Sequence, residues 1–340
     1  MKLLKKLLLG LVVLLVVVVG GGLAAFLALT PKQHPPSSEK VALTPERVAR
    51  GRYLVEHVAD CFGCHAGHDF SRWGGPVRKG TEGVNEDCLD ESMGAPGTIC
   101  FPNITPDPET GIGSWTDGEI LRAIREGVGR KGQTLFPMMP YDVYRGLSDE
   151  DARSIVAYLR TLPPVRKAVP RSQIKFPVNL MVRLAPQPVS TPIVAPDPSD
   201  TIAYGKYLAH GVAGCAFCHT RVDKHAQPIP GMLLAGGQEF VGPWGRVVSA
   251  NITTDPTGIG TMTRENFIGL IRSFANQEEV AVPVAEGENT VMPWLPYAGM
   301  SESDLGAIYD YLRTVPPVHH EIQKWPRPQV AAAAVPAAAQ

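Results

Sequence analysis

The chain has 340 residues, with 32 lysines and arginines against 33 aspartates and glutamates, so its formal net charge is −1. This balance argues against nucleic acid as a partner, because no basic stripe is present. The length allows two or three domains, and the composition is ordinary for a globular protein.

The first thirty residues predict a membrane anchor. Lys2, Lys5 and Lys6 precede an uncharged run from Leu7 to Leu29. A helix of this length spans about 30 Å of hydrocarbon at ~1.5 Å per residue. A cleaved signal peptide has a shorter apolar region and a small-residue cleavage site. We therefore expect residues 1–30 to remain as a transmembrane helix with the lysines inside; cleavage is the alternative.

A polar, proline-rich tether is expected at residues 31–43. Thr44 and Pro45 then predict the start of a helix, since a capping hydroxyl before proline is a start signal. The apolar side of this helix is supplied by Val48, Leu54, Val55 and Val58.

Residues 61–65 read Cys-Phe-Gly-Cys-His, which is the attachment signature of a c-type haem. The two cysteines can bond the two vinyl groups of one porphyrin, while the histidine supplies a nitrogen to iron. A second copy at residues 215–219 argues against a chance match, so we expect two covalently bound haem c groups. The predicted attachment sites are Cys61, Cys64, Cys215 and Cys218, and the predicted proximal ligands are His65 and His219.

Other sites use similar cysteine spacing. A zinc site would need a second ligand pair, which Cys88 and Cys100 formally offer. A thioredoxin-like redox pair would lie in a βαβ context, which the flanking sequence does not show. The second copy of the whole signature favours haem over both alternatives.

The two halves of the chain are related by an internal repeat. Gly-Arg-Tyr-Leu at 51–54 matches Gly-Lys-Tyr-Leu at 205–208, the same offset of 154 that separates the cysteines. Further matches pair 103–107 with 251–255, 111–113 with 258–260, 139–140 with 292–293, and 158–161 with 311–314. A repeat this long indicates tandem modules and not a solenoid, whose periods are about 20–50 residues.

We therefore expect a mainly α-helical fold with two tandem haem domains, at residues 44–166 and 200–320, and long Gly- and Pro-rich loops. A Pro-rich connector is expected at 167–199 and an Ala-rich tail at 321–340. Capping-box patterns that predict further helix starts lie at Thr116, Ser148 and Ser301.

The sixth iron ligand separates electron carriers from catalysts. Of nine methionines, Met139 and Met292 occupy equivalent places in the repeat, and each precedes a proline. Proline keeps the loop extended and removes a competing donor, which suits a thioether directed at iron. A loop methionine is usually core filling, but the duplication favours axial ligation here. Met138 is the rival ligand in the first module.

The remaining histidines have no equivalent in the other half, so surface or haem-propionate contacts are expected in place of iron ligation. Among them are His57, His68, His210, His225, His319 and His320. Arg52 and Lys206 are repeat-matched cations, and pairing with propionates and simple solvation are both open for them.

Cys88 and Cys100 lie in a stretch of the first module that has no counterpart in the second. They are the two cysteines that remain after the four of the haem motifs, and an even number of remaining cysteines in an oxidising compartment predicts a disulfide between them. Unlinked loop cysteines are the main alternative, and a distal cysteine ligand is a more remote one.

The haem motif, Asn-Ile-Thr-Pro-Asp, Gly-Ile-Gly, Met-Pro-Tyr and Tyr-Leu-Arg-Thr-Leu-Pro-Pro-Val occur in this order. This series resembles the class I cytochrome c modules in cytochrome subunits of membrane-bound alcohol and gluconate dehydrogenases, over residues 46–166 and 200–320. The resemblance implies helical haem c domains with His/Met ligation that pass electrons from a dehydrogenase towards quinone or an oxidase. Those subunits usually carry three haem modules, whereas this chain has two.

The leading hypothesis is therefore a single-pass dihaem electron carrier of the bacterial inner membrane, with its globular part in the periplasm. Its expected partners are redox proteins: a dehydrogenase or quinol side as donor, and an oxidase or another cytochrome as acceptor. The alternative is a dihaem redox enzyme, such as a peroxidase or a sulfur-compound oxidising enzyme. Such an enzyme needs one iron that can open, and the matched methionines argue against it.

Overall fold

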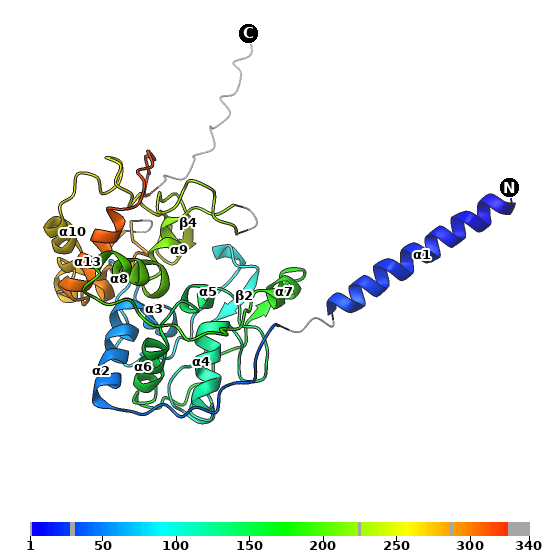
Figure 1. Cartoon of the computed structure of the whole chain (residues 1–340), viewed down its shortest axis with the longest axis horizontal. Coiled ribbons are helices and arrows are strands. Elements are labelled where there is room, and N and C mark those ends of the chain that lie inside the picture. The colour runs from blue at the N-terminus through cyan, green and yellow to red at the C-terminus, as the bar shows by residue number, and fades with distance from the viewer. Residues whose placement is uncertain (1, 28–30, 224–225, 286–287, 326–340) are drawn as a thin grey trace, which may run out of the picture. The chain divides into compact units, whose positions relative to one another are not determined.

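The structure is a computed structural model that describes residues 2–27, 31–223, 226–285 and 288–325. Its described part is mainly helical, as the sequence predicts (Figure 1). The longer helices are α1 (Lys2–Leu27), α2 (Pro45–Tyr53), α4 (Asp117–Glu126), α6 (Asp149–Leu159), α8 (Thr201–Tyr207), α10 (Arg264–Arg272) and α13 (Glu302–Leu312). The shorter helical segments are η1 (Leu54–Val58), α3 (Phe62–His65), η2 (Glu91–Met93), α5 (Tyr141–Tyr144), α7 (Val178–Met181), η3 (Val182–Leu184), η4 (Leu208–Val212), α9 (Cys215–His219), α11 (Gln277–Val280) and α12 (Trp294–Tyr297).

The chain forms two compact units. The first comprises Met1–Val55 and Gly83–Ala195, and the second comprises Glu56–Glu82 and Pro196–Gln340. This division runs through the first predicted module, because the segment that carries the first haem motif belongs to the second unit.

Each unit contains one close helix crossing built on glycine. In the first unit α2 packs against α6, and a Cβ at Gly51 would lie 1.8 Å from the Ser154 carbonyl oxygen. In the second unit α8 packs against α13, and a Cβ at Gly205 would lie 1.8 Å from the Ala307 carbonyl oxygen. The two glycines are 154 residues apart, so the repeated sequence produces the same local packing twice.

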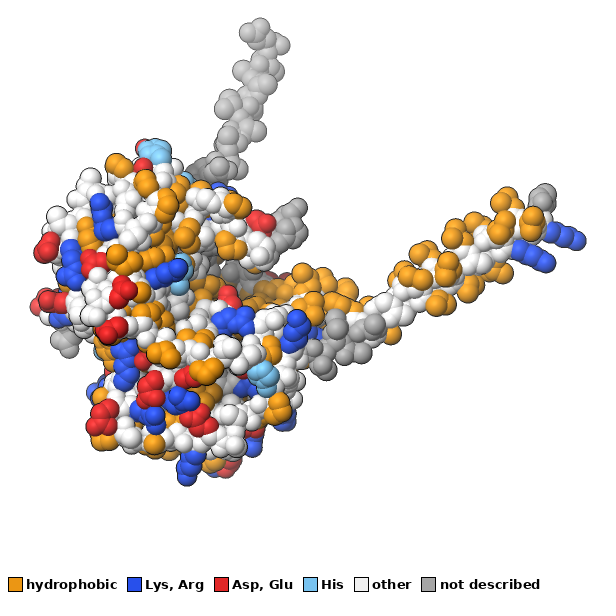
Figure 2. Space-filling view, in the orientation of Figure 1, with side chains coloured by type: hydrophobic (Ala, Val, Ile, Leu, Met, Phe, Trp, Pro, Cys, Tyr) orange, Lys and Arg blue, Asp and Glu red, His pale blue; other side chains and the backbone are white. Residues whose placement is uncertain are grey.

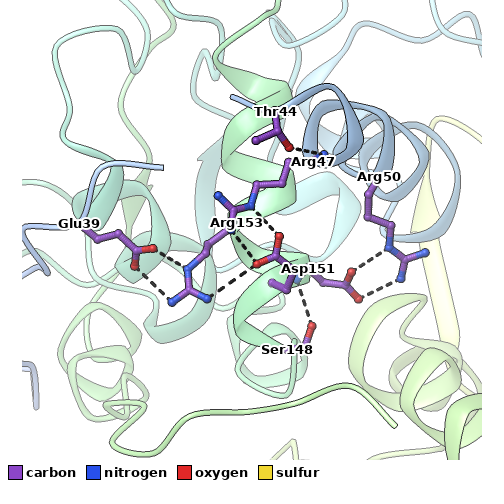
Figure 3. A network of polar contacts seen from close by, with 8 residues as sticks. Glu39, Thr44, Arg47, Arg50, Ser148, Asp151 and Arg153 are labelled. Atoms are coloured by element: carbon purple, nitrogen blue, oxygen red, sulfur yellow. Dashed lines mark hydrogen bonds and ion pairs between the residues drawn. The ribbon is translucent and has the colours of Figure 1, made fainter. Parts of the chain in front are cut away.

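Ion pairs join α2 to α6 in the first unit (Figure 3). The Arg50 guanidinium donates two hydrogen bonds to the Asp151 carboxylate, at 2.8 and 3.0 Å. Arg47 binds Glu150 in the same two-pronged way, at 2.6 and 3.0 Å. The second unit has no arginine at the corresponding positions of α8, so these pairs belong to the first unit alone.

The predicted helix starts are confirmed. Thr116 and Glu119 form a reciprocal capping box at the start of α4. The hydroxyl oxygens of Ser148 and Ser301 accept backbone N–H bonds at the starts of α6 and α13.

The apolar faces of these helices form the core of each unit, since burial of such side chains is the main driving force for folding. Fully buried residues of the first unit include Leu54, Val55, Leu147, Val156 and Val128. Fully buried residues of the second unit include Leu208, Val212, Leu234, Met300, Leu305 and Leu312.

A small sheet in the first unit includes one strand from the connector, at residues 173–174. β1 (Cys88–Leu89), β2 (Gly97–Cys100) and β3 (Gln173–Ile174) form an antiparallel sheet in the order β1-β2-β3. Cys88 lies directly opposite Cys100 in the register, and their sulfur atoms form a disulfide bond. In the second unit, β4 (Glu239–Gly242) and β5 (Gly245–Val248) form a hairpin.

The helix α1 exposes its apolar side chains along its length. It is long and apolar enough to cross a bilayer, although a signal sequence near the N-terminus would meet the same criterion. The Ala-rich part of the predicted tail, residues 326–340, lies outside the described residues.

Two candidate haem-binding sites

Both Cys-x-x-Cys-His motifs fold as a single helical turn within the second unit. The first occupies α3 together with the residue before it, and the second occupies α9. Residues at positions i, i+3 and i+4 share one face of a helix. Each motif therefore presents two sulfurs and one imidazole on the same side: Cys61, Cys64 and His65 in one, and Cys215, Cys218 and His219 in the other.

The chain enters the two turns in the same way. A π-helical turn, η1 or η4, precedes each motif, followed by a residue in the left-handed region. That residue is Asp60, with φ 44°, in one case and Gly214, with φ 64°, in the other. The Asp60 carboxylate accepts a hydrogen bond from the Gly63 N–H at 3.1 Å, and burial raises its pKa to about 6.

A backbone carbonyl orients the second histidine. His219 is buried, and its Nδ1 lies 2.7 Å from the Ala250 carbonyl oxygen. This bond requires the proton on Nδ1 and leaves Nε2 free to bind iron. Burial lowers the pKa of His219, which favours the neutral imidazole that a metal needs.

The repeated Asn-Ile-Thr segment holds that carbonyl in place. Asn251 follows Ala250, and its side-chain amide donates to the Val318 carbonyl oxygen at 2.9 Å. Its Oδ1 accepts from the Thr253 N–H at 2.9 Å. Asn103 makes the corresponding bonds in the first unit, with Val165. In each unit, the asparagine side chain therefore binds the loop that contains it to the chain that follows α6 or α13.

The four motif cysteines are partly buried free thiols. Burial raises the pKa of Cys61, Cys64 and Cys215 to about 12 and that of Cys218 to about 11. For Cys64, the negative charge of the nearby Asp60 adds to the effect of burial.

The zinc alternative does not fit these sites. Cys88 and Cys100, the additional pair that it would need, are joined in the disulfide. Within the described residues, no group of three or more His, Cys, Asp or Glu could hold a metal ion. Two thiols and an adjacent imidazole on one helical face instead fit the donor set of a covalent haem.

The two Met-Pro segments adopt the same turn. Pro140 has φ −79° and ψ 55°, and Pro293 has φ −77° and ψ 59°. In each turn the methionine carbonyl accepts the N–H two residues later, at 2.8 Å. Met139 and Met292 are both half-buried, and so is the rival Met138. Met139 belongs to the first unit, whereas Met292 shares the second unit with both Cys-x-x-Cys-His turns.

A tyrosine ties the Met292 turn to the second motif. Tyr297 lies in α12, directly after the turn, and its hydroxyl donates to the Ala213 carbonyl oxygen at 2.5 Å. Ala213 is two residues before Cys215 in the chain. The bond therefore connects the segment of a candidate axial ligand to the segment of the thioether cysteines.

A buried asparagine connects the two motif regions within the second unit. Asn289 is 2% exposed, and its amide donates to the carbonyl oxygens of Phe70 and Arg72, both at 2.9 Å. Its Oδ1 accepts from the Gly74 N–H at 2.8 Å and the Thr290 N–H at 2.7 Å. It thus fastens the loop after the first motif to the segment that leads to the Met292 turn.

Sequence reasoning missed Asn289, because the repeat has no asparagine at the corresponding position and no local pattern marks it. An aromatic stack supports the same contact: the Trp73 and Phe274 rings lie 4.8 Å apart, and Phe274 and Trp294 lie 4.9 Å apart.

The other histidines bind protein groups. His57 bonds to the Pro296 carbonyl at 3.1 Å, His210 to the Tyr311 hydroxyl at 2.6 Å, and His320 to the Ala235 carbonyl at 2.8 Å. His68 uses both ring nitrogens for backbone carbonyls, and His319 pairs with Asp255. His225 lies outside the described residues. Arg52 lies over the Tyr158 ring at 5.5 Å, while Lys206 is exposed.

The chain is similar to known c-type cytochromes. Residues 48–163 match the family model described as Cytochrome c. The chain is 31% identical over 279 residues to the fructose dehydrogenase cytochrome subunit of Gluconobacter japonicus, covering 79% of this chain and 52% of that protein. It is 29% identical over 286 residues to the gluconate 2-dehydrogenase cytochrome c subunit of Pantoea cypripedii, covering 79% and 59%.

A third relative is a dihaem c-type cytochrome of Cereibacter sphaeroides, 32% identical over 197 residues, covering 57% of this chain and 63% of that protein. The chain spans little more than half the length of the dehydrogenase subunits that it matches. Residues 48–163 thus form a haem-binding cytochrome c domain, and the chain is similar to cytochrome c subunits of fructose, alcohol and gluconate dehydrogenases.

Proposed function

We propose that the chain is a dihaem c-type cytochrome built from two tandem modules. Cys61, Cys64 and His65 would hold one haem, and Cys215, Cys218 and His219 the other. The observation that carries this proposal is the repetition of one site geometry, with the same π-helical entry, left-handed residue and Cys-x-x-Cys-His turn. The dihaem relative supports the same count.

Met139 and Met292 are proposed as the second axial ligands. Their turns have the same backbone conformation, and Tyr297 joins the Met292 turn to the second motif. A haem bound with His and Met ligation supplies one-electron chemistry at a raised reduction potential. The protein's own part is to orient His219 through Ala250, exclude water with its loops and keep the axial position closed.

The proposed role is electron transfer between a dehydrogenase or quinol donor and a downstream oxidase or cytochrome. It is supported by relatives that are named as cytochrome subunits of dehydrogenases. We further propose that α1 anchors the chain in the bacterial inner membrane, with both modules in the periplasm. Its length and its exposed apolar surface support this placement.

Carbon monoxide binding distinguishes the two hypotheses, an electron carrier with two closed irons and a dihaem enzyme with one open iron. Irons closed by methionine leave no open position, so the fully reduced holoprotein should show less than about a tenth of its haem binding carbon monoxide, and no peroxide turnover. A haem-to-protein ratio of two, measured by pyridine haemochrome, should accompany this result. One haem that binds carbon monoxide readily, together with peroxide turnover, would instead establish the dihaem enzyme.

A further inference from the structure

An apolar surface lies on the first unit around α7 and η3. Phe176, Met181 and Leu184 are 72%, 58% and 53% exposed, within nine residues of the chain. Leu180, on the other side of the same helical segment, is 4% exposed and fixes that segment to the unit. We call Phe176, Met181 and Leu184 the connector patch. Figure 2 shows hydrophobic side chains gathered over α7.

Basic residues lie close to the connector patch in the sequence. Arg171, Lys175 and Arg183 lie in the same stretch of chain, and Lys175 forms an ion pair with Glu91. Apolar side chains among cations suit the headgroup layer of an anionic bilayer.

The length of the chain places this patch near the end of the anchor. Pro31 lines a cavity of about 460 Å³ together with Ile174, Asn179 and Val182 of the connector. The helix α1 ends at Leu27, four residues before Pro31. Four residues reach at most about 14 Å, and the headgroup layer adds about 5–7 Å on each side of the hydrocarbon.

We propose that the connector patch inserts into the headgroup layer of the membrane that α1 crosses, so that the first unit rests on the lipid surface. This inference rests on the proposed anchoring of α1. Its partner is the lipid itself, because the chain keeps the patch within reach of the bilayer on every anchored molecule.

A fluorescent label tests this contact in the full-length holoprotein. Leu184→Cys carries an environment-sensitive nitrobenzoxadiazole probe, and the protein is placed in nanodiscs of phosphatidylethanolamine and phosphatidylglycerol. Val194→Cys is the matched control, since Val194 is 86% exposed on the same unit but lies outside the connector patch. The probe at 184 should gain at least twofold in intensity and be quenched by lipids spin-labelled near the headgroup, while the probe at 194 should not change.

The outcomes separate the patch from the anchor. A chain that fails to enter nanodiscs contradicts the anchoring of α1, and the patch proposal fails with it. A chain that enters nanodiscs with a water-like probe at 184 contradicts the patch proposal alone. A probe at 184 that responds to an added dehydrogenase but not to lipid would make the patch a protein-docking surface and overturn the proposal.

Discussion

Replacement of Asn289 by alanine should loosen the link between the two motif regions. The Asn289 side chain makes four hydrogen bonds, and three of them join it to the loop at residues 70–74. At about 0.5–1.5 kcal/mol net for each bond, the loss of three bonds costs about 3 kcal/mol of unfolding free energy.

Asn289→Ala should also affect Met292, which we propose as an axial ligand. Asn289 binds the Thr290 N–H, and the Thr290 hydroxyl accepts from the Met292 N–H at 3.1 Å. Loss of this chain of bonds lets the Met292 turn move. We therefore expect Asn289→Ala to weaken the sulfur-to-iron charge-transfer band of one haem and lower its reduction potential, while leaving the other haem unchanged.

Asn85→Ala is the control, because Asn85 is also a buried asparagine that accepts a backbone N–H bond, but it lies in the first unit and outside the Asn-Ile-Thr segment. Guanidinium titrations give the stability of both variants, and a spectroscopic redox titration gives the potentials. Comparable stability losses, with a band change confined to Asn289→Ala, would support the positioning role. A stability loss below about 1 kcal/mol, or an identical band change in both variants, would refute the reasoning.

Three further predictions concern stability. Replacing Cys88 and Cys100 together by alanine should lower the unfolding free energy, measured by guanidinium titration, by about 3 kcal/mol, because their disulfide closes a loop with a sequence separation of 12. A reductant that destabilises the double variant as much as the wild type would contradict this. Arg50→Ala should lower the unfolding free energy by about 2 kcal/mol, since it removes two hydrogen bonds to the buried Asp151 carboxylate. Removing both side chains should recover part of that loss, and an additive double variant would show that the pair contributes nothing. Burial lowers the pKa of His210, so the unfolded chain binds a proton more readily, and the unfolding free energy should fall as the pH drops below about 6.5. His210→Asn should reduce this pH dependence of the unfolding free energy between pH 7.5 and 5.5. An unchanged pH dependence would assign it to other groups.

The local features of the sites could be predicted from the sequence. The Cys-x-x-Cys-His signature requires one helical turn, and both copies form one. The capping serines and threonines also mark real helix starts, because their hydroxyls satisfy backbone N–H groups within three residues. Such features depend only on neighbouring residues, so a single sequence contains them.

The division into units could not be predicted in the same way. Residues 56–82 belong to the second unit through contacts across about 200 residues of chain, such as the Arg72 side chain on the Ala281 carbonyl at 2.5 Å. The partners of these bonds are mostly backbone groups, which every residue has. The Ala250 carbonyl that orients His219 was missed for the same reason.

Measurement of the sulfur-to-iron charge-transfer band during a redox titration tests the central claim, two haems with His/Met ligation, most directly. The oxidised full-length protein should show the band at both haems, both at positive potentials. Met139→Ala and Met292→Ala should each remove about half of the band, while Met138→Leu should leave it unchanged. A wild-type protein with the band at only one haem, or a Met138 variant that loses it, would contradict the proposed ligation.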